Sequence, residues 1–168
     1  MSARVYVGLG SNTEREANII AALGKMREAF GELLLSPVYN SAAVGFDGSD
    51  FLNLVAGFET ALEVDTVVGK LRRIEDQLGR DRNLPKFSRR TIDLDILTYG
   101  VLVMDNAGIQ VPRHEILKNG FVLKPLQDLA PQTLHPGVGD SYSVLWQLMA
   151  PHAPRLDVFP LDIEDTGD

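Results

Sequence analysis

An alternation of apolar residues and aspartates runs through residues 91–97, Thr-Ile-Asp-Leu-Asp-Ile-Leu. This period of two is typical of a β-strand that has one face in a core and the other in polar surroundings. We therefore expect Ile92, Leu94 and Ile96 to be buried. Asp93 and Asp95 would then share the opposite face, about 7 Å apart along the strand. The segment predicts a sheet that carries two neighbouring carboxylates on one face.

Two carboxylates held side by side repel each other unless a cation lies between them. Magnesium prefers oxygen ligands, and when one or two carboxylates bind it, water and substrate phosphates usually fill the remaining positions. The pattern therefore favours a metal-nucleotide site at Asp93 and Asp95. The alternative is a solvated Asp-x-Asp on a strand face, although aspartate is uncommon in strands.

A cluster of basic residues precedes the two aspartates. Residues 70–90 hold eight Lys or Arg and three Asp or Glu, a local net charge of +5 in a chain whose formal net charge is −7. Guanidinium groups match phosphate oxygens in a two-pronged geometry. The combination predicts a polyphosphate held between a metal ion and arginines.

The composition excludes several classes of protein and site. The chain has no cysteine, which rules out disulfides, thiolate metal sites and a cysteine nucleophile. A pI near 4.9 argues against general nucleic-acid affinity. No apolar run of about 18 residues and no signal-peptide pattern occur, so we expect a cytoplasmic protein without a membrane partner. We expect a monomer with one domain over residues 1–160 and a disordered acidic tail over 161–168.

The hydrophobic periodicity predicts six main elements. They are a strand over 4–10, a helix over 14–30 capped by Asn12 or Thr13 and ended by Gly31, a strand over 33–39 interrupted at Pro37, a strand over 51–59, a helix over 60–78, and the Asp-bearing strand. This order indicates a ferredoxin-like β-α-β-β-α-β sandwich of the α+β class. Two helices would cover one sheet face, and long loops over 40–50 and 80–90 would gather over the other. Short helices are expected around 126–129 and 144–148.

Six segments in order span roughly residues 5–136. They are Tyr-Val-Gly-Leu-Gly-Ser-Asn at 6–12, Ser-Pro-Val-Tyr at 36–39, Phe-Leu-Asn at 51–53, Arg-Ile-Glu at 73–75 with Leu-Gly-Arg-Asp-Arg at 78–82, Arg-Thr-Ile-Asp-Leu-Asp-Ile at 90–96, and Phe-Val-Leu-Lys-Pro-Leu at 121–126 with Ala-Pro at 130–131. Together they resemble the 6-hydroxymethyl-7,8-dihydropterin pyrophosphokinases, also called 2-amino-4-hydroxy-6-hydroxymethyldihydropteridine diphosphokinases.

The resemblance implies a magnesium-dependent transferase of folate biosynthesis that uses small-molecule substrates. It would move the terminal diphosphate of ATP to the hydroxymethyl group of a reduced pterin and release AMP. Like that family, the chain has no P-loop, so positioning and charge neutralisation would carry the chemistry. The resemblance places two magnesium ions at Asp93 and Asp95, with Arg80, Arg82 and Arg90 stabilising the phosphates.

The resemblance also assigns residues to two substrate sites. The pterin site would comprise Ser41, Val44, Phe51, Asn53 and Phe121, with the two aromatic rings stacking on the pterin and the asparagine hydrogen-bonding it. The ATP site would comprise Glu75, Ile96, and Arg113 or His114. Each assignment has a simpler alternative: the phenylalanines as core, Asn53 as the cap of a turn, and the arginines and His114 as surface residues.

The match is weakest on the nucleotide side. The family's aromatic-Gly-Pro-Arg motif is replaced by Phe-Ser-Arg-Arg at 87–90, its Pro-His pair by Pro112 and Arg113, and its arginine before the stacking aromatic by Asn119 and Gly120. Three interpretations follow: a pyrophosphokinase with a modified nucleotide pocket, a diverged paralogue that binds a pterin or nucleotide-like ligand with weak or altered transfer, or an RNA-binding module. The last lacks the aromatic-rich strand motif that such modules use.

Overall fold

The alternating segment forms strand β5 (Asp93–Tyr99) in a computed structural model that describes residues 2–42, 49–79, 92–106 and 108–163. Ile92, Leu94 and Ile96 are buried, at 2%, 4% and 7% exposure. The two aspartates between them are only partly buried. The predicted division of this strand into an apolar and an acidic face is therefore confirmed.

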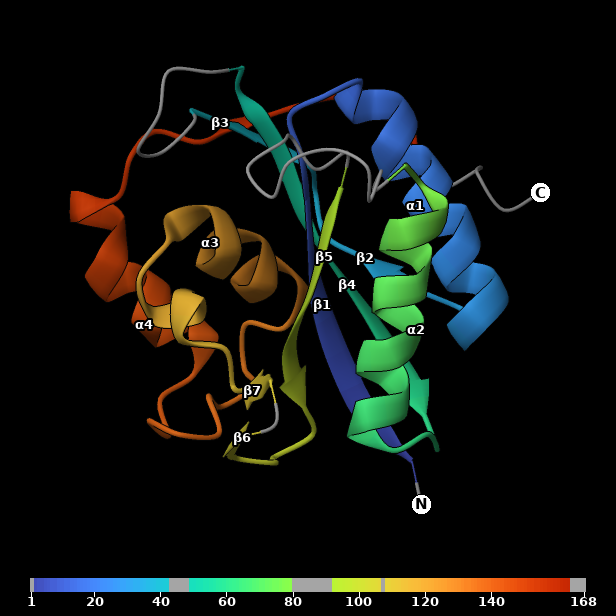
Figure 1. Ribbon diagram of the computed structural model, residues 1–168. Coiled ribbons are helices and arrows are strands. Elements are labelled where there is room, and N and C mark those ends of the chain that lie inside the picture. Colours follow the sequence, from blue (N-terminus) through green and yellow to red (C-terminus); the bar gives the residue numbers. More distant parts are fainter. Residues whose placement is uncertain (1, 43–48, 80–91, 107, 164–168) are drawn as a thin grey trace.

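The structure is a mixed α/β fold in which four α-helices accompany an antiparallel sheet (Figure 1). Before β5 come β1 (Ala3–Ser11), α1 (Arg15–Phe30), β2 (Leu34–Leu35), β3 (Tyr39–Ser41), β4 (Phe51–Thr60) and α2 (Val64–Gln77). After it come β6 (Met104–Asn106), β7 (Ile109–Val111), α3 (Gly120–Leu129), α4 (Tyr142–Met149) and β8 (Asp157–Val158), with short 3-10 turns at His114–Leu117 and Ala150–His152. None of the helices described combines the length and apolar character that crossing a bilayer requires.

The sheet has the strand order β5-β1-β4-β3-β8, and β2 pairs with β4 beside β3. All of these pairings are antiparallel. The interruption predicted at Pro37 is confirmed, because β2 and β3 are two pieces on either side of it that both pair with β4. Proline lacks the N–H that a continuous ladder needs, which explains the gap.

Helices α1 and α2 cover one face of the sheet, as predicted (Figure 1). The apolar stripes of these helices pack against alternate residues of β1, β4 and β5 to form the larger core. The ring of Phe30 in α1 stacks on that of Phe58 in β4, with centroids 4.3 Å apart. Helix α1 is followed by Gly31 at a φ of 87°, a left-handed conformation that glycine adopts without strain.

The start of α1 differs from the prediction. The N-cap position is Glu14, in a left-handed conformation with φ of 40° and no side-chain capping bond, so neither Asn12 nor Thr13 caps the helix. Instead, the carbonyl oxygen of Thr13 accepts hydrogen bonds from Ser11 Oγ at 3.1 Å and Asn18 Nδ2 at 2.6 Å. These two hydrogen bonds stabilise the turn between β1 and α1, in place of the expected capping bond.

Helices α3 and α4 cover the opposite face, where the prediction placed long loops. Most of those loops, residues 43–48 and 80–90, lie outside the described residues. Helix α3 packs Leu123 and Leu126 onto the sheet against Tyr6 and Val55, and α4 lies outside α3 (Figure 1). Helix α3 begins at Gly120, well before the predicted start near residue 126, and Pro125 lies inside it. A proline normally disfavours a helix interior, but here it is buried in the packed interface between helix and sheet.

The chain after α4 returns to the sheet and packs on it. Strand β8 pairs with β3, and the Phe159 N–H donates to the Val38 carbonyl oxygen at 2.8 Å. Ile163 is 6% exposed within the larger core, and its carbonyl oxygen accepts a hydrogen bond from Arg27 at 3.1 Å. Packing thus extends beyond the boundary expected at residue 160, and the remainder of the expected tail, 164–168, lies outside the described residues.

Candidate active site

Two glycines of β1 align the predicted site residues on the α3 face of the sheet. Gly10 pairs with Asn53 of β4 on one side and with Asp93 of β5 on the other. Gly8 pairs with Asp95 in the next row of the same face. Directly opposed residues in an antiparallel sheet point to the same face, so the sheet register brings the amide and both carboxylates together.

The glycines also leave space that a larger residue would fill. A Cβ atom on Gly10 would lie 2.9 Å from Asn53 Oδ1, closer than real Cβ contacts. A side chain at position 10 would therefore force Asn53 to shift, so glycine here permits the close approach of the amide. The sequence analysis did not identify this role, although two glycines inside one strand were a visible signal.

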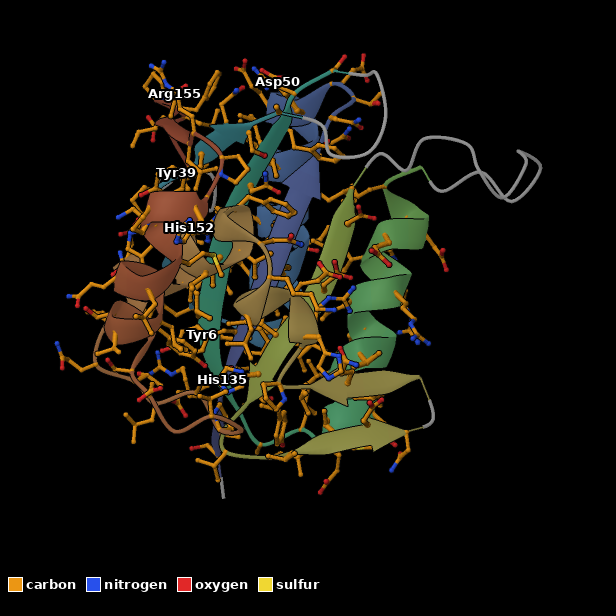
Figure 2. All side chains as sticks on the ribbon, turned by 90° about the vertical axis from the view of Figure 1, so that its left-hand side faces the viewer. Tyr6, Tyr39, Asp50, His135, His152 and Arg155 are labelled. Carbon is orange, nitrogen blue, oxygen red and sulfur yellow. The ribbon has the colours of Figure 1, made fainter. Side chains whose placement is uncertain are left out.

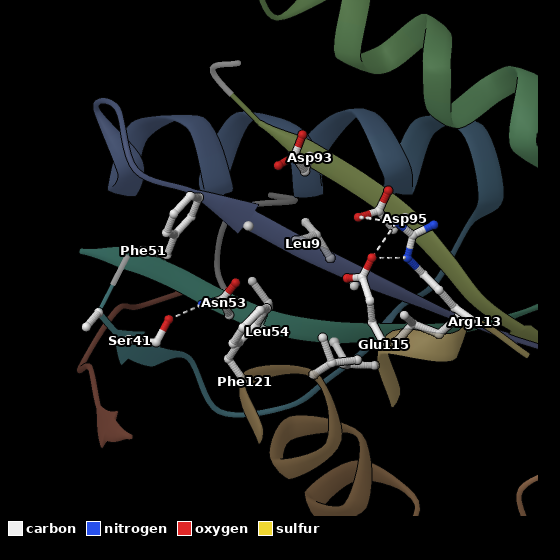
Figure 3. Close-up of a pocket in the computed structure, with 16 residues that line it drawn as sticks. Leu9, Ser41, Phe51, Asn53, Leu54, Asp93, Asp95, Arg113, Glu115 and Phe121 are labelled. Atoms are coloured by element: carbon white, nitrogen blue, oxygen red, sulfur yellow. Dashed lines mark hydrogen bonds and ion pairs between the residues drawn. The ribbon is translucent and has the colours of Figure 1, made fainter. Parts of the chain in front are cut away.

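A first cavity of about 340 Å³ opens above these rows (Figure 3). Its volume is in the range of small-molecule sites. Four of the residues predicted for the pterin site line it, as do both aspartates. Among the described residues, the lining is Gly8, Leu9, Gly10, Ser41, Ala42, Phe51, Asn53, Leu54, Val55, Asp93, Asp95, Leu97, Arg113, Glu115, Phe121 and Val122.

The polar part of this cavity is internally hydrogen-bonded. Asn53 Nδ2 donates to Ser41 Oγ at 2.7 Å, and both residues are buried, at 7% and 6% exposure (Figure 3). Asn53 lies inside β4 and not at a turn, so the alternative of a turn cap is wrong. The hydrogen bond fixes the orientation of the amide before any ligand arrives.

Two aromatic rings reach the cavity from different elements. Phe51 begins β4 and Phe121 lies in the first turn of α3, and both side chains are partly exposed (Figure 3). Phe121 packs at the margin of the smaller core on the α3 face, so the alternative of core packing holds for it only in part.

A side-chain network joins the two walls that carry Ser41 and Phe121. The Tyr39 hydroxyl of β3 donates to Asp128 of α3, and Lys124 Nζ lies 2.8 Å from the same carboxylate. Burial and this carboxylate raise the pKa of Tyr39 above its usual range, so the hydroxyl remains a donor. Tyr39 is buried between the sheet and the α3 layer, which faces the viewer in Figure 2.

A second cavity of about 390 Å³ lies between α2, β5 and β7. Glu75, Ile96 and Arg113, all predicted for the ATP site, line it. Asp95 and Arg113 line both cavities, so the two spaces adjoin at this pair. The described residues that line it are Val68, Leu71, Arg72, Glu75, Leu94, Asp95, Ile96, Gly108, Ile109, Gln110 and Arg113.

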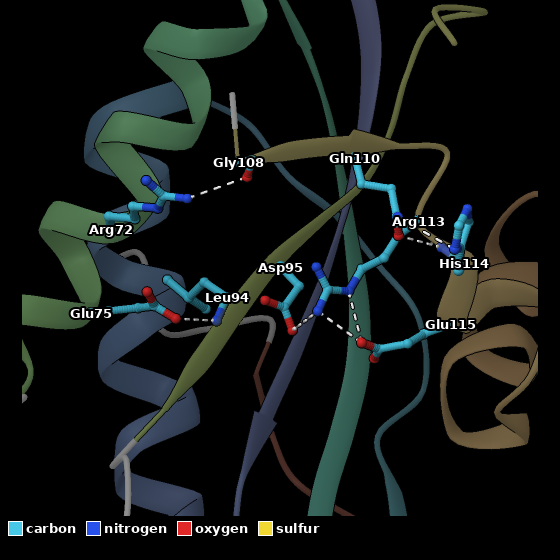
Figure 4. Close-up of polar contacts among 9 residues, drawn as sticks. All are labelled: Arg72, Glu75, Leu94, Asp95, Gly108, Gln110, Arg113, His114 and Glu115. Atoms are coloured by element: carbon cyan, nitrogen blue, oxygen red, sulfur yellow. Dashed lines mark hydrogen bonds and ion pairs between the residues drawn. The ribbon is translucent and has the colours of Figure 1, made fainter. Parts of the chain in front are cut away.

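Glu75 fastens α2 to the aspartate-bearing strand. Its Oε2 accepts a hydrogen bond from the backbone N–H of Leu94 at 2.8 Å, and the residue is 8% exposed (Figure 4). A buried carboxylate requires such a donor. Because Leu94 lies between Asp93 and Asp95, Glu75 helps to set the position of both.

Arg113 is held at the junction of the cavities by two carboxylates (Figure 4). Its Nε and Nη2 donate to Glu115 Oε1 at 3.1 and 2.7 Å, and Nη2 lies 3.8 Å from Asp95 Oδ2. Burial acts to lower the pKa of Arg113, but the negative charges of Asp95 and Glu115 outweigh it and the pKa is raised. The guanidinium is therefore a permanent cation here.

Of the remaining predicted residues, the structure describes only His114. His114 is exposed and lines neither one; its backbone N–H donates to Gln110 Oε1 at 2.9 Å, and its ring Nδ1 lies 3.3 Å from Gln110 Nε2. Val44, Arg80, Arg82 and Arg90, with the altered motif at 87–90, lie outside the described residues.

The two aspartates fit a magnesium site that substrate completes. Both are partly exposed, and both line the first cavity. Within the described ranges, no group of three or more His, Cys, Asp or Glu could hold an ion. Asp93 and Asp95 would therefore supply two carboxylates, with water and phosphate oxygens as the other ligands.

Sequence reasoning missed three polar residues at this site. Glu115 orients Arg113, Gln110 holds His114, and Arg72 Nη2 lies 3.5 Å from the Gly108 carbonyl oxygen (Figure 4). The only available signal for Glu115 was its position two residues after an arginine that departs from the family pattern. These contacts depend on the path of the chain and not on local spacing.

The family model for 7,8-dihydro-6-hydroxymethylpterin-pyrophosphokinase (HPPK) matches residues 6–131. Enzymes named 2-amino-4-hydroxy-6-hydroxymethyldihydropteridine pyrophosphokinase are similar along most of their length. That of Pseudomonas aeruginosa is 40% identical over 144 residues, which cover 81% of this chain and 86% of the relative. That of Aquifex aeolicus is 35% identical over 136 residues, 80% of this chain and 84% of the relative.

Among solved structures, wild-type Plasmodium falciparum HPPK-DHPS with pteroate has a similar fold, with a TM-score of 0.73 at 12% identity. The match covers 99% of this chain but only 45% of that longer one. At this level of identity the likeness concerns the fold.

Proposed function

The chain belongs to the 7,8-dihydro-6-hydroxymethylpterin-pyrophosphokinase family, and we propose that its two adjoining cavities form the two halves of that active site. The reaction is transfer of diphosphate from ATP to 6-hydroxymethyl-7,8-dihydropterin, with release of AMP, in folate biosynthesis.

The observation that carries the proposal is the sharing of Asp95 and Arg113 by both cavities. A diphosphate passing from nucleotide to pterin must cross from one substrate site to the other. A carboxylate suited to a metal and a permanent cation at that crossing are the groups such a transfer needs.

We assign the pterin to the first cavity. A pterin is flat and aromatic, and its edge carries hydrogen-bond donors and acceptors. Phe51 and Phe121 offer apolar surfaces for stacking, and Asn53 offers an amide that can pair with the ring edge. Ser41 would orient that amide through the 2.7 Å hydrogen bond. Val44 is assigned to the same site on the family resemblance.

We assign ATP to the second cavity, with its phosphates directed toward Asp95. Ile96 would contact the adenine, and Glu75 would keep β5 in register beside it. Arg113 would contact the phosphates, with His114 as an outer contributor. Arg80, Arg82 and Arg90 would share the phosphate charge, a role that rests on the resemblance and on the basic composition of residues 70–90.

We propose that the reaction depends on two magnesium ions held by Asp93 and Asp95. When bound, the ions would neutralise phosphate charge and help to align the reacting oxygens. The protein's own part is to keep the two carboxylates on one sheet face and to exclude water with its aromatic walls.

For the framework, we propose a ferredoxin-like arrangement. If β2 and β3 count as one interrupted strand, the elements through β5 run β-α-β-β-α-β and the sheet order places the first strand between the last and the third. We further propose that the chain forms one domain and acts as a monomer.

The test is an assay of AMP release with purified protein, ATP, magnesium and 6-hydroxymethyl-7,8-dihydropterin. We expect AMP only when all three small molecules are present, and none when EDTA exceeds magnesium. AMP release that survives EDTA would refute the metal proposal. Tight pterin binding without AMP release would instead favour the diverged paralogue.

A further inference from the structure

Arg113 has two carboxylate partners of unequal strength at the junction of the cavities. Glu115 Oε1 accepts from both Nε and Nη2, whereas Asp95 Oδ2 lies 3.8 Å from Nη2. The backbone of Arg113 is also fixed, because its N–H donates to the Leu97 carbonyl oxygen at 2.8 Å. The guanidinium can thus leave Asp95 and still remain at the junction.

Both ion pairs are accessible to solvent. The side chains of Arg113, Asp95 and Glu115 are 30%, 38% and 39% exposed. Ion pairs with this exposure are weak and are readily exchanged for another charge. A divalent cation that approaches Asp95 would therefore compete directly with Nη2 for the same carboxylate oxygen.

We propose that Arg113 serves as a counter-cation of Asp95 before metal binds, and that Glu115 is the positioning residue that retains Arg113 at the junction when metal takes Asp95. This inference rests on the proposed function, because it assumes that Asp95 is a metal ligand. With a metal ion bound at Asp95, Arg113 would remain held by Glu115 at the junction, where its guanidinium could contact phosphate oxygens.

The arrangement gives opposite signs for two substitutions. Arg113→Met removes the competing cation, so the ligand-free protein binds a divalent ion more tightly, by about fivefold. Glu115→Gln removes the competing carboxylate, so Arg113 pairs more fully with Asp95 and the ion binds more weakly, by about threefold. In the double variant Arg113 is absent, so there is no guanidinium for Glu115 to hold. The Glu115 substitution then changes the affinity for the divalent ion little.

The experiment measures Mn²⁺ affinity of the purified protein without nucleotide, by electron paramagnetic resonance, for wild type, both single variants and the double variant. The double-mutant cycle separates coupling through Arg113 from a simple long-range charge effect of Glu115. An equal loss on Glu115→Gln in both backgrounds overturns the positioning role. Unchanged or weaker Mn²⁺ binding in Arg113→Met overturns the counter-cation role.

Two controls keep the inference separate from the function on which it rests. Asp95→Asn must weaken Mn²⁺ binding; if it does not, the metal assignment has failed and not only the role of Arg113. Glu115→Asp keeps the carboxylate and should restore most of the wild-type affinities for Mn²⁺ and for a magnesium complex of a non-hydrolysable ATP analogue. If Glu115→Asp did not restore these affinities, although its thermal midpoint equalled that of the wild type, a role for the carboxylate in holding Arg113 would be contradicted.

Discussion

The two cavities are built in different ways. The first lies on the sheet and contains a buried, hydrogen-bonded pair, Asn53 and Ser41, joined across paired strands. The charged side chains of its lining are Asp93, Asp95, Arg113 and Glu115. The second lies between α2, β5 and β7, and several of its polar groups are charged side chains that reach in from different elements. Its contact between Arg72 and Gly108 is exposed and, at 3.5 Å, long for a hydrogen bond.

This difference bears on one departure from the family pattern, the arginine at position 113. Hydrogen bonds to a ring edge depend steeply on distance and angle, whereas attraction between charges falls off gradually. A cavity that recognises shape and hydrogen bonds tolerates little change, while one that recognises phosphate charge can use an arginine at position 113 in place of a histidine. Arg113 lies where the two cavities adjoin and lines both of them.

The largest effect should come from the residue that the two cavities share. We expect Asp95→Asn to lower AMP release by about a hundredfold or more, because a metal ion supplies several kcal/mol to such a step and each ~1.4 kcal/mol is a factor of ten. Folding should be retained, since the side chain is 38% exposed. Steady-state assays and a thermal melt measure both quantities.

Asp140→Asn is the matched control, because Asp140 is exposed and lines neither cavity. Its activity should equal that of the wild type. If Asp95→Asn kept near-normal AMP release, the junction would not be the place of transfer.

The second effect is confined to the first cavity. Asn53→Ala should weaken pterin binding by roughly tenfold to a hundredfold, since an unmade hydrogen bond in a buried site costs about 1–3 kcal/mol, and should leave ATP binding unchanged. Calorimetry with each ligand measures the two affinities. Ser41→Ala breaks the same internal hydrogen bond but keeps the amide, so its loss of pterin affinity should be smaller. Equal losses of pterin affinity in the two variants would mean that Asn53 supports the structure of the cavity and does not contact the pterin.

The third test concerns the link between α2 and β5. Glu75→Ala should lower the free energy of unfolding by roughly 2 kcal/mol, because it leaves the Leu94 N–H without its acceptor in a buried place. Glu75→Gln retains an acceptor oxygen and should recover most of that stability. Urea denaturation measures both. Identical midpoints for wild type and Glu75→Ala would show that the hydrogen bond does not support the strand.

The smallest effect is expected at the outside of the second cavity. His114→Ala should reduce ATP affinity by no more than about threefold, because the side chain is exposed and lines neither cavity. Binding of a non-hydrolysable ATP analogue measures this, with the exposed His152→Ala as control. A tenfold loss specific to His114 would instead make it a principal phosphate ligand.

The comparison also shows what sequence could predict. Alternation through Ile92 and Ile96 predicted the faces of β5 correctly, because a strand's period of two follows from its backbone alone. The break at Pro37 and the helix end at Gly31 were likewise local consequences of residue type. The alternation alone was enough to place Asp93 and Asp95 on one face of β5.

Features that depend on distant contacts were not accessible in the same way. Helix α3 runs through Pro125 because packing on the sheet outweighs the lost backbone hydrogen bond. The pairing of Arg113 with Glu115 and Asp95 requires the path of the chain after β7. Ile163 was assigned to an acidic tail because its neighbours are charged, yet its side chain is buried in the larger core.

The short strand β8 has a consequence for self-association. A strand with unpaired N–H and C=O groups along its outer side is a template onto which another chain can add. Here β8 occupies that side of β3, the strand that ends in Ser41, and Arg15 lies over the Phe159 ring that follows. Removal of the segment from residue 157 onward would uncover the β3 edge, and a strand of another molecule could then pair with it beside the first cavity.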